Sequence, residues 1–227
     1  MSDTPSRDEI HDAIDRAVRT LLDDAGIQEP PVDIARLVRH LGLGPDAAAK
    51  RGRAGVIAKL EETVTSRAWL GAHALGEHLR PTLMRQLDLD PAQPRALGGQ
   101  SLPNLFADRL LVPTKWLASL GREHGWDLVE LERSFRPAGH ELIAWRMLDL
   151  AEPVAITIVT DGRVTRRRSN AFRVGKTLSD PEARCVEMVN RDGKPGEVRE
   201  MGWQVQCWPI HDGERKREIL RSQYQGE

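Results

Sequence analysis

The sequence predicts an α+β protein with a mainly helical N-terminal domain and a small β-rich C-terminal region. Two observations carry this prediction. Before residue 152, apolar residues recur at three- and four-residue steps, which is the spacing of a helix face that packs on a core. After residue 153, short runs of β-branched residues stand on either side of turn sequences, which is typical of strands and hairpins. We therefore expect two domains, residues 1–152 and residues 153–227.

The first two helices are expected over residues 8–25 and 32–41. In both segments isoleucine, leucine and valine recur at helical spacing. Acidic residues open the first segment, where they interact favourably with the helix dipole. Gly26 follows the first segment and Gly42 follows the second, and glycine is the residue that most often ends a helix.

The next part of the sequence alternates between loops and regular elements. Residues 43–54 are small and polar and are expected to form a loop, followed by a short strand over 55–60. Helical spacing returns in residues 62–87, where Pro81 is expected to end or kink the helix because proline has no N–H to donate. Two prolines and two glycines in residues 88–100 predict a second loop.

Further helices are expected on both sides of Pro113. One ends before this proline, and a short one starts near Thr114. A pair of helices is then expected over residues 127–135 and 140–150, joined by a turn that contains proline and glycine.

The C-terminal region begins with a predicted hairpin. Residues 154–159 and 164–170 have strand composition, and the sequence Asp-Gly-Arg between them is a turn signal. Residues 203–210 alternate polar and apolar side chains and predict another strand. Trp203 and Trp208 at its ends are expected to be core or interface residues.

Composition excludes several classes of protein. Apolar residues make up 40% of the chain, enough for a hydrophobic core, and the charged 30% nearly balance at a net charge of −1. A nucleic-acid or anionic-membrane surface needs a marked basic excess, so neither partner is expected. The chain has no apolar run near the ~18 residues of a membrane span and no signal-peptide core at its start, so we expect a cytoplasmic protein.

The two cysteines do not form a metal motif. Cys185 and Cys207 are far apart in sequence, and neither belongs to a Cys-x-x-Cys or Cys-x-x-His pair. A zinc site of the finger type and a disulfide scaffold are therefore not expected. We expect both residues to be buried thiols.

The segment GAHALGEHLR, residues 71–80, contains candidate metal ligands. A zinc-peptidase helix carries two histidines at positions i and i+4, so that both imidazoles reach one ion, and a glutamate beside the first activates water. Here His73 is present, Ala74 stands where the glutamate belongs, and Glu77 stands at i+4. His78 lies about 140° around the helix from His73, and only a π-bulge would bring these two residues together.

A second motif supports a family resemblance. Asn104, Phe106, Ala107, Leu110, Leu111 and Pro113 match the spacing of a family segment, Asn-x-Phe-Ala-x-x-Leu-Leu-x-Pro, and RAWLGAHALGEHL looks like the family's zinc helix. Over residues 30–150 the chain resembles the ImmA/IrrE-type zinc metallopeptidases. The resemblance implies a zincin-like fold for the N-terminal domain, bound zinc and a peptide substrate. In the family, an acidic residue in the second segment supplies the third zinc ligand.

The departures from the family fall on the chemistry. Ala74 replaces the catalytic glutamate, and Glu77 replaces the second histidine. Near the expected third ligand stand Gln100, Ser101 and Leu102, none of which is acidic. Asp108 lies about 240° around the helix from residue 102, on the wrong side for that role. Candidate zinc ligands are thus His73 and Glu77, with His78 as an alternative, and no catalytic residue is assigned. We expect weak or absent peptidase activity.

Three other features have both a structural and a functional interpretation. His140-Glu141 could begin a second zinc helix, but Ala144 stands at i+4, and Glu141 suits the first turn of any helix. The helix pair over 127–150 could read DNA, but its acidic residues disfavour phosphate contact. Residues 166–168 are three arginines, either a solvated edge strand or a docking site for phosphate or an acidic partner, with the middle one facing away from the other two.

Two functions follow from these observations. The first is a metallopeptidase-like protein that binds zinc and is weak or inactive as a peptidase. The second is a non-catalytic regulatory protein that keeps the peptidase fold and uses its C-terminal β region to bind a protein partner.

Overall fold

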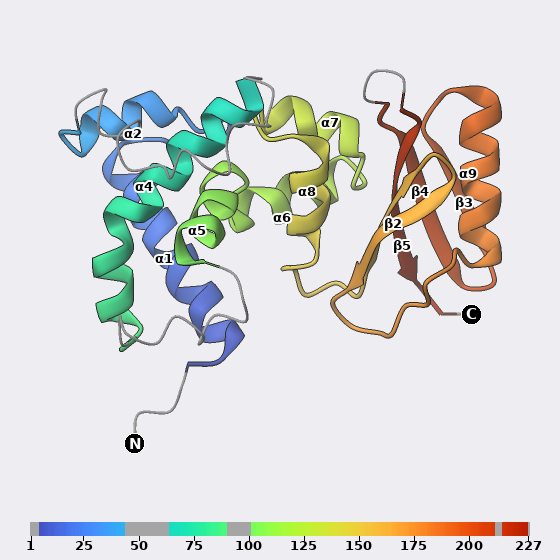
Figure 1. The fold of residues 1–227 in the computed structure, drawn as a ribbon, viewed down its shortest axis with the longest axis horizontal. Coiled ribbons are helices and arrows are strands. Elements are labelled where there is room, and N and C mark those ends of the chain that lie inside the picture. The colour runs from blue at the N-terminus through green and yellow to red at the C-terminus, as the bar shows by residue number, and fades with distance from the viewer. Residues whose placement is uncertain (1–4, 44–63, 90–100, 212–214, 227) are drawn as a thin grey trace. The chain divides into compact units, whose positions relative to one another are not determined.

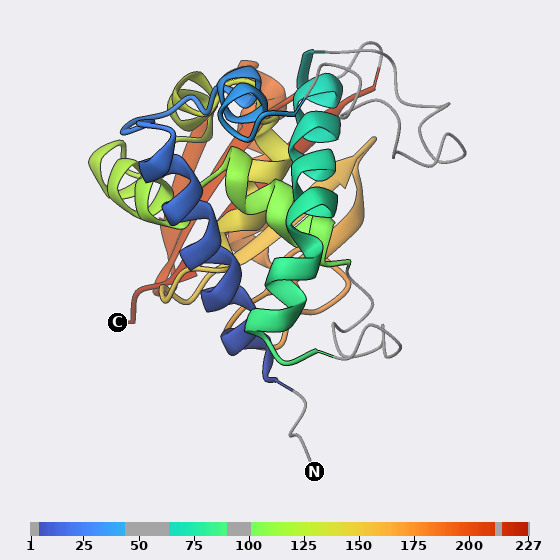
Figure 2. The same cartoon turned by 90° about the vertical axis from the view of Figure 1, so that its left-hand side faces the viewer.

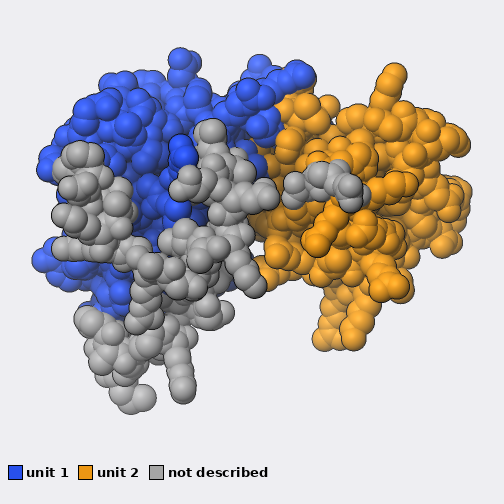
Figure 3. All heavy atoms as spheres, turned by 45° about the horizontal axis from the view of Figure 1, so that its top comes forward, with its two compact units in different colours: residues 1–126, 131–139 blue, residues 127–130, 140–227 orange. Residues whose placement is uncertain are grey.

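The computed structural model describes residues 5–43, 64–89, 101–211 and 215–226. Helices precede a small antiparallel sheet along the chain, which confirms the coarse part of the predicted fold class (Figures 1 and 2). The chain divides into two compact units (Figure 3). We call residues 1–126 and 131–139 the helical unit, and residues 127–130 and 140–227 the sheet unit. The sheet unit includes residues 140–152, which precede the boundary expected from sequence.

The first helix, α1, runs over Arg7–Asp24, as the sequence predicts. Its start is stabilised by a reciprocal capping box, in which the Glu9 amide donates to the Ser6 hydroxyl and the Ser6 amide donates to the Glu9 carboxylate. Its buried face consists of the periodic apolar residues Ile10, Ala13, Ile14, Val18, Leu21 and Leu22. The spacing of these residues therefore located both the helix and its core face correctly.

Helices α2 (Ile34–His40) and α4 (Val64–Gln86) confirm the next two predicted helices. Pro81 does not end α4, which continues through it to Gln86. Leu83 and Leu87 are buried beyond the proline, so the packing of the last turn outweighs the one hydrogen bond that proline removes. The strand expected over 55–60 and nearly all of the two expected loops lie outside the described residues.

Helix α5 (Leu102–Leu111) packs closely on α4. Gly76 makes this approach possible, because a Cβ atom there would lie only 2.9 Å from Pro103 Cα and 3.0 Å from the Pro103 carbonyl oxygen. Helix α5 ends before Pro113, and α6 (Thr114–Glu123) begins directly after it, as predicted.

Helices α7 (Leu128–Ser134) and α8 (His140–Met147) confirm the predicted helix pair. Helix α8 belongs to the sheet unit and contacts strand β5. None of the helices in the described part of the chain is long and apolar enough to cross a membrane.

The sheet has five antiparallel strands in the order β2-β1-β5-β4-β3. Strands β1 (Ala155–Thr160) and β2 (Arg163–Ser169) form the predicted hairpin, and β4 (Trp203–Pro209) is the other predicted strand. Strands β3 (Gly196–Glu200) and β5 (Arg217–Tyr224) and a helix over Asp180–Asp192 were not predicted from the sequence.

Helix α9 (Asp180–Asp192) lies along one face of the sheet (Figure 1). The core between them consists of buried residues from the helix and three strands: Val159, Cys185, Val186, Val189, Val205, Cys207 and Leu220. Both cysteines are free and fully buried there, as predicted. Trp208 is buried and Trp203 packs against the edge of this core, which confirms their expected role.

Candidate functional site

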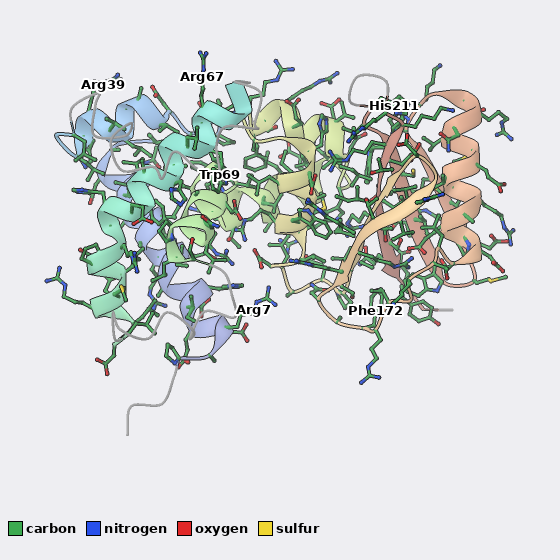
Figure 4. All side chains as sticks on the ribbon, viewed as in Figure 1. Arg7, Arg39, Arg67, Trp69, Phe172 and His211 are labelled. Atoms are coloured by element: carbon green, nitrogen blue, oxygen red, sulfur yellow. The ribbon has the colours of Figure 1, made fainter. Side chains whose placement is uncertain are left out.

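His73 lies on α4, one helical turn after Trp69, which is labelled in Figure 4. The imidazole stacks on the Trp69 indole, with ring centroids 5.2 Å apart and planes 30° apart. The same indole donates a hydrogen bond of 3.0 Å from Nε1 to Asp108 Oδ1 on α5. Trp69 thus joins the candidate metal ligand to a carboxylate of the neighbouring helix.

The sequence-based expectation placed Asp108 about 240° around the helix from residue 102, on the wrong side for the third zinc ligand. In the structure the Asp108 carboxylate accepts a hydrogen bond from Trp69 on α4. Among the described residues, no group of three ligands that could hold a metal ion includes Asp108. Asp108 therefore links α5 to α4 through Trp69, the residue that also stacks on His73.

The other two candidate ligands, Glu77 and His78, form no three-ligand group with His73 among the described residues. Glu77 Oε2 lies 3.8 Å from Arg80 Nη1, and His78 is exposed. Helix α4 is α-helical from Val64 to Gln86, without the π-bulge that would rotate His78 toward His73. The described face around His73 therefore supplies at most two of these three ligands, His73 and Glu77.

A zinc site in a protein needs three or four ligands within about 2.0–2.3 Å of the ion. Within residues 5–43, 64–89, 101–211 and 215–226, the structure contains no group of three or more His, Cys, Asp or Glu side chains that could hold a metal ion. The described residues around His73 thus do not fit a three-ligand zinc site.

A groove that the sequence analysis did not identify lies between α1 and α6. Its volume is about 520 Å³. It is lined by one face of α1, by the residues after it, and by the first turns of α6: Asp12, Asp15, Arg16, Val18, Arg19, Leu22, Asp23, Ile27, Gln28, Pro113, Thr114, Lys115, Trp116 and Ala118. The groove combines an apolar base with charged side chains of both signs.

Asp15 holds the two walls of this groove together. The Thr114 hydroxyl lies 2.9 Å from both carboxylate oxygens and donates to them. Arg109 Nε lies 3.4 Å from Oδ1, and the Arg109 side chain is only 2% exposed. Because Asp15 has both a hydroxyl and a buried guanidinium as partners, its charge is compensated within the helical unit.

In the sheet unit, Glu141 accepts hydrogen bonds from three side chains. Trp145 Nε1 donates to it at 3.0 Å, and the guanidinium groups of Arg166 and Arg217 form ion pairs with it. Burial raises the pKa of Glu141, but the bond from Trp145 and the charges of the two arginines outweigh burial and hold the pKa below its usual value. Glu141 therefore connects α8 to β2 and β5.

The three consecutive arginines of β2 all have partners within the sheet unit. Arg166 pairs with Glu141, and the Arg168 guanidinium lies 5.6 Å from the ring centre of Trp145. Arg167 faces the opposite side of the sheet, as predicted, and donates to both oxygens of Glu182 at 2.9 and 2.7 Å. On α8, Arg146 is buried and pairs with Asp149. The three consecutive arginines thus contribute to the packing of the sheet unit.

Comparisons with known proteins support the fold. The chain matches no family model and no curated protein. Among solved structures it is similar to a Mycobacterium tuberculosis transcriptional regulator, with 18% sequence identity, a TM-score of 0.55, and coverage of 96% of this chain and 80% of the regulator. At this identity the likeness shows the fold alone.

Proposed function

We propose that this chain is a regulatory protein that has a metallopeptidase-like helical unit and acts by binding rather than by peptide hydrolysis. The zincin-like fold rests on the ImmA/IrrE resemblance of the segments around His73 and Phe106. The regulatory role is supported by the similar fold of the Mycobacterium tuberculosis transcriptional regulator.

The observation that carries the proposal is the position of Trp69. Its indole stacks on His73 and donates a hydrogen bond to Asp108, the carboxylate of α5. Ala74 supplies no general base next to His73. Because Trp69 contacts both His73 and Asp108, these side chains serve the packing of α4 on α5 rather than the activation of a metal-bound water.

The first experiment measures bound zinc and peptide cleavage. Purified wild type, His73→Ala and His78→Ala are compared for zinc content and for zinc-dependent cleavage of an unfolded casein substrate. His78→Ala is the matched control, because His78 is an exposed histidine of the same helix. We expect no cleavage by any of the three. Stoichiometric zinc and cleavage in the wild type, both lost only in His73→Ala, would contradict the proposal and support the metallopeptidase alternative.

The second experiment tests the regulatory role in cells. Transcript levels are compared between the parent strain, a strain that lacks the gene, and that strain supplied with wild type or His73→Ala. We expect the deletion to change transcript levels and both genes to restore them. Unchanged transcript levels in the deletion strain would count against regulation, and failure of His73→Ala alone would show that the histidine acts beyond packing.

A further inference from the structure

The groove between α1 and α6 has a charge pattern that packing does not explain. Asp12, Asp15, Arg16, Arg19 and Asp23 share one face of α1, because they follow one another at steps of one, three and four residues. Helix α6 lies beside α1 in the helical unit (Figure 2).

The cations of this groove differ from the other arginines described above. Arg16, Arg19 and Lys115 are exposed, and the described residues offer none of them a hydrogen bond or an ion pair. By contrast, the three consecutive arginines of β2, Arg166, Arg167 and Arg168, all have partners within the sheet unit. Although Asp12, Asp15 and Asp23 also line the groove, none of them pairs with these three cations among the described residues, so an anion bound there would gain charge-assisted hydrogen bonds.

The contact between Asp15 and Thr114 places these cations together. It fixes the start of α6 against the middle of α1, so Lys115 and Trp116 lie beside the turn that carries Arg16 and Arg19. Asp12 and Asp23 each stand four residues from the nearer arginine, a spacing at which helix side chains are neighbours, yet neither forms an ion pair with it. Since Arg109 and Thr114 compensate Asp15, the middle of the groove is basic.

The same part of the groove is apolar below and aromatic at the side. Val18, Leu22 and Ile27 are buried and form its base. The half-buried Trp116 leaves part of its indole accessible to the groove. A volume of about 520 Å³ matches a small organic ligand rather than a lone ion.

We propose that this groove binds a small organic anion that carries a flat aromatic group. Its phosphate or carboxylate lies among Arg16, Arg19 and Lys115, and its ring lies against Trp116. The proposal goes beyond the regulatory function, since an effector site in this groove depends neither on zinc nor on His73.

The test uses 8-anilinonaphthalene-1-sulfonate, a fluorescent anion with two aromatic groups, and N-phenyl-1-naphthylamine, its neutral analogue. We expect saturable binding of the anion to the full chain and weaker binding of the neutral probe. The double substitution Arg16→Ala/Arg19→Ala should weaken binding of the anion by about tenfold or more, because charge-assisted contacts are lost, and should change binding of the neutral probe little. Equal loss of both probes, or no loss of either, would overturn the proposal.

Matched variants separate this effect from general loss of charge or fold. Arg39→Ala removes an exposed arginine of α2 that does not line the groove, and it should leave binding unchanged (Figure 4). Lys115→Ala gives an independent charge deletion on α6. Trp116→Phe should keep the binding that Trp116→Leu loses, and binding unaffected by Trp116→Leu would exclude the aromatic contact.

Competition then identifies the anion. Phenyl phosphate and salicylate are each titrated against the bound fluorescent anion. Displacement by phenyl phosphate alone assigns a phosphate ligand, and displacement by salicylate alone assigns a carboxylate. Displacement by neither would show that the groove does not recognise small aromatic anions, and it would overturn the proposal.

Discussion

Trp69 and Asp108 join α4 to α5 through a hydrogen bond of 3.0 Å between residues 39 positions apart in sequence. Both helices also contribute to the apolar core, with Leu75, Phe106 and Leu110 almost completely buried. The hydrogen bond adds direction to this packing, because the indole donor and the carboxylate acceptor meet only in one rotation of α4 relative to α5. It also decides how His73, which stacks on the same indole, is oriented.

Replacement of Trp69 by phenylalanine is expected to destabilise the helical unit by about 1 kcal/mol, because a hydrogen bond to a charged acceptor is lost while an aromatic ring remains against His73. Urea unfolding followed by circular dichroism measures this change. Trp116→Phe is the matched control, since the Trp116 indole donates no hydrogen bond to any residue in the described ranges. Equal losses in the two variants would show that the bond to Asp108 contributes nothing.

Two glycines of α4 provide a paired test of helix packing. At Gly76 a Cβ atom would meet the backbone of Pro103 at 2.9 Å, whereas at Gly71 it would meet the Cγ2 atom of Ile34 at 2.8 Å. Both Gly→Ala changes gain the same helix propensity, up to about 1 kcal/mol. The Ile34 side chain can move away from a new Cβ atom at residue 71, whereas the Pro103 backbone cannot move away from one at residue 76. We expect Gly76→Ala to be less stable than Gly71→Ala by about 1–3 kcal/mol in urea unfolding. The reverse order would show that α5 shifts without cost.

Glu182 makes the sheet unit sensitive to acid. Burial raises its pKa, but hydrogen bonds from Ser179 and Ser222 and the charge of Arg167 outweigh burial and hold the pKa below its ordinary value of 4.5. Because the folded-state pKa is the lower one, this stabilisation is complete above pH 4.5 and is lost as the pH falls through the folded-state pKa.

The Glu182→Gln variant should therefore lose roughly 3–5 kcal/mol at neutral pH, because the nearly buried Arg167 loses its carboxylate. Its free energy of unfolding should also depend less on pH below 4.5 than that of the wild type. Glu187→Gln on the same helix changes an exposed carboxylate and serves as the control. Parallel pH profiles for wild type and Glu182→Gln would rule out this role for Glu182.

Glu218 should have the opposite dependence on pH. It is 1% exposed, and neither of its carboxylate oxygens has a hydrogen-bond partner among the described residues. Burial raises its pKa above 4.5. The folded state therefore keeps a proton that the unfolded chain releases, and stability falls as the pH rises from 4.5 through the folded-state pKa.

In Glu218→Gln this loss should disappear, because the amide stays neutral at all pH values. We expect the variant to unfold at a higher temperature than the wild type at pH 8 and at a similar temperature at pH 4 or below. Differential scanning calorimetry across this range measures both. A variant that is less stable than the wild type at pH 8 would show that the ionised carboxylate finds a partner in the folded protein.

Local patterns in the sequence predicted the described helices that precede the sheet, the first hairpin and strand β4. In α1 the apolar period, the acidic first turn and the closing glycine all agree, and the structure follows them. Helix α9 was not predicted, although the Ser179–Glu182 capping box and Pro181 mark its start and Gly193 marks its end. Its low apolar content concealed it, because only one narrow face packs on the sheet.

Other features depend on contacts between distant residues. Strand β5 has Glu218, Arg221 and Ser222 at buried positions, so it lacks the apolar pattern of a central strand. The groove between α1 and α6 depends on the contact of Asp15 with Thr114, which are 99 residues apart. Asp108 likewise acquires its place only when α5 packs on α4. No local pattern contains this information.

The central position of β5 has a consequence for protein synthesis. Strand β5, over Arg217–Tyr224, lies between β1 and β4 and joins the hairpin of β1 and β2 to the hairpin of β3 and β4. The ribosome therefore releases both hairpins before the strand that unites them. Until that strand emerges, β1 and β4 expose unpaired backbone edges, which are sites for association with other chains. The sheet unit can therefore complete its fold only after Tyr224 has been synthesised, and chaperones can bind the exposed strand edges before then.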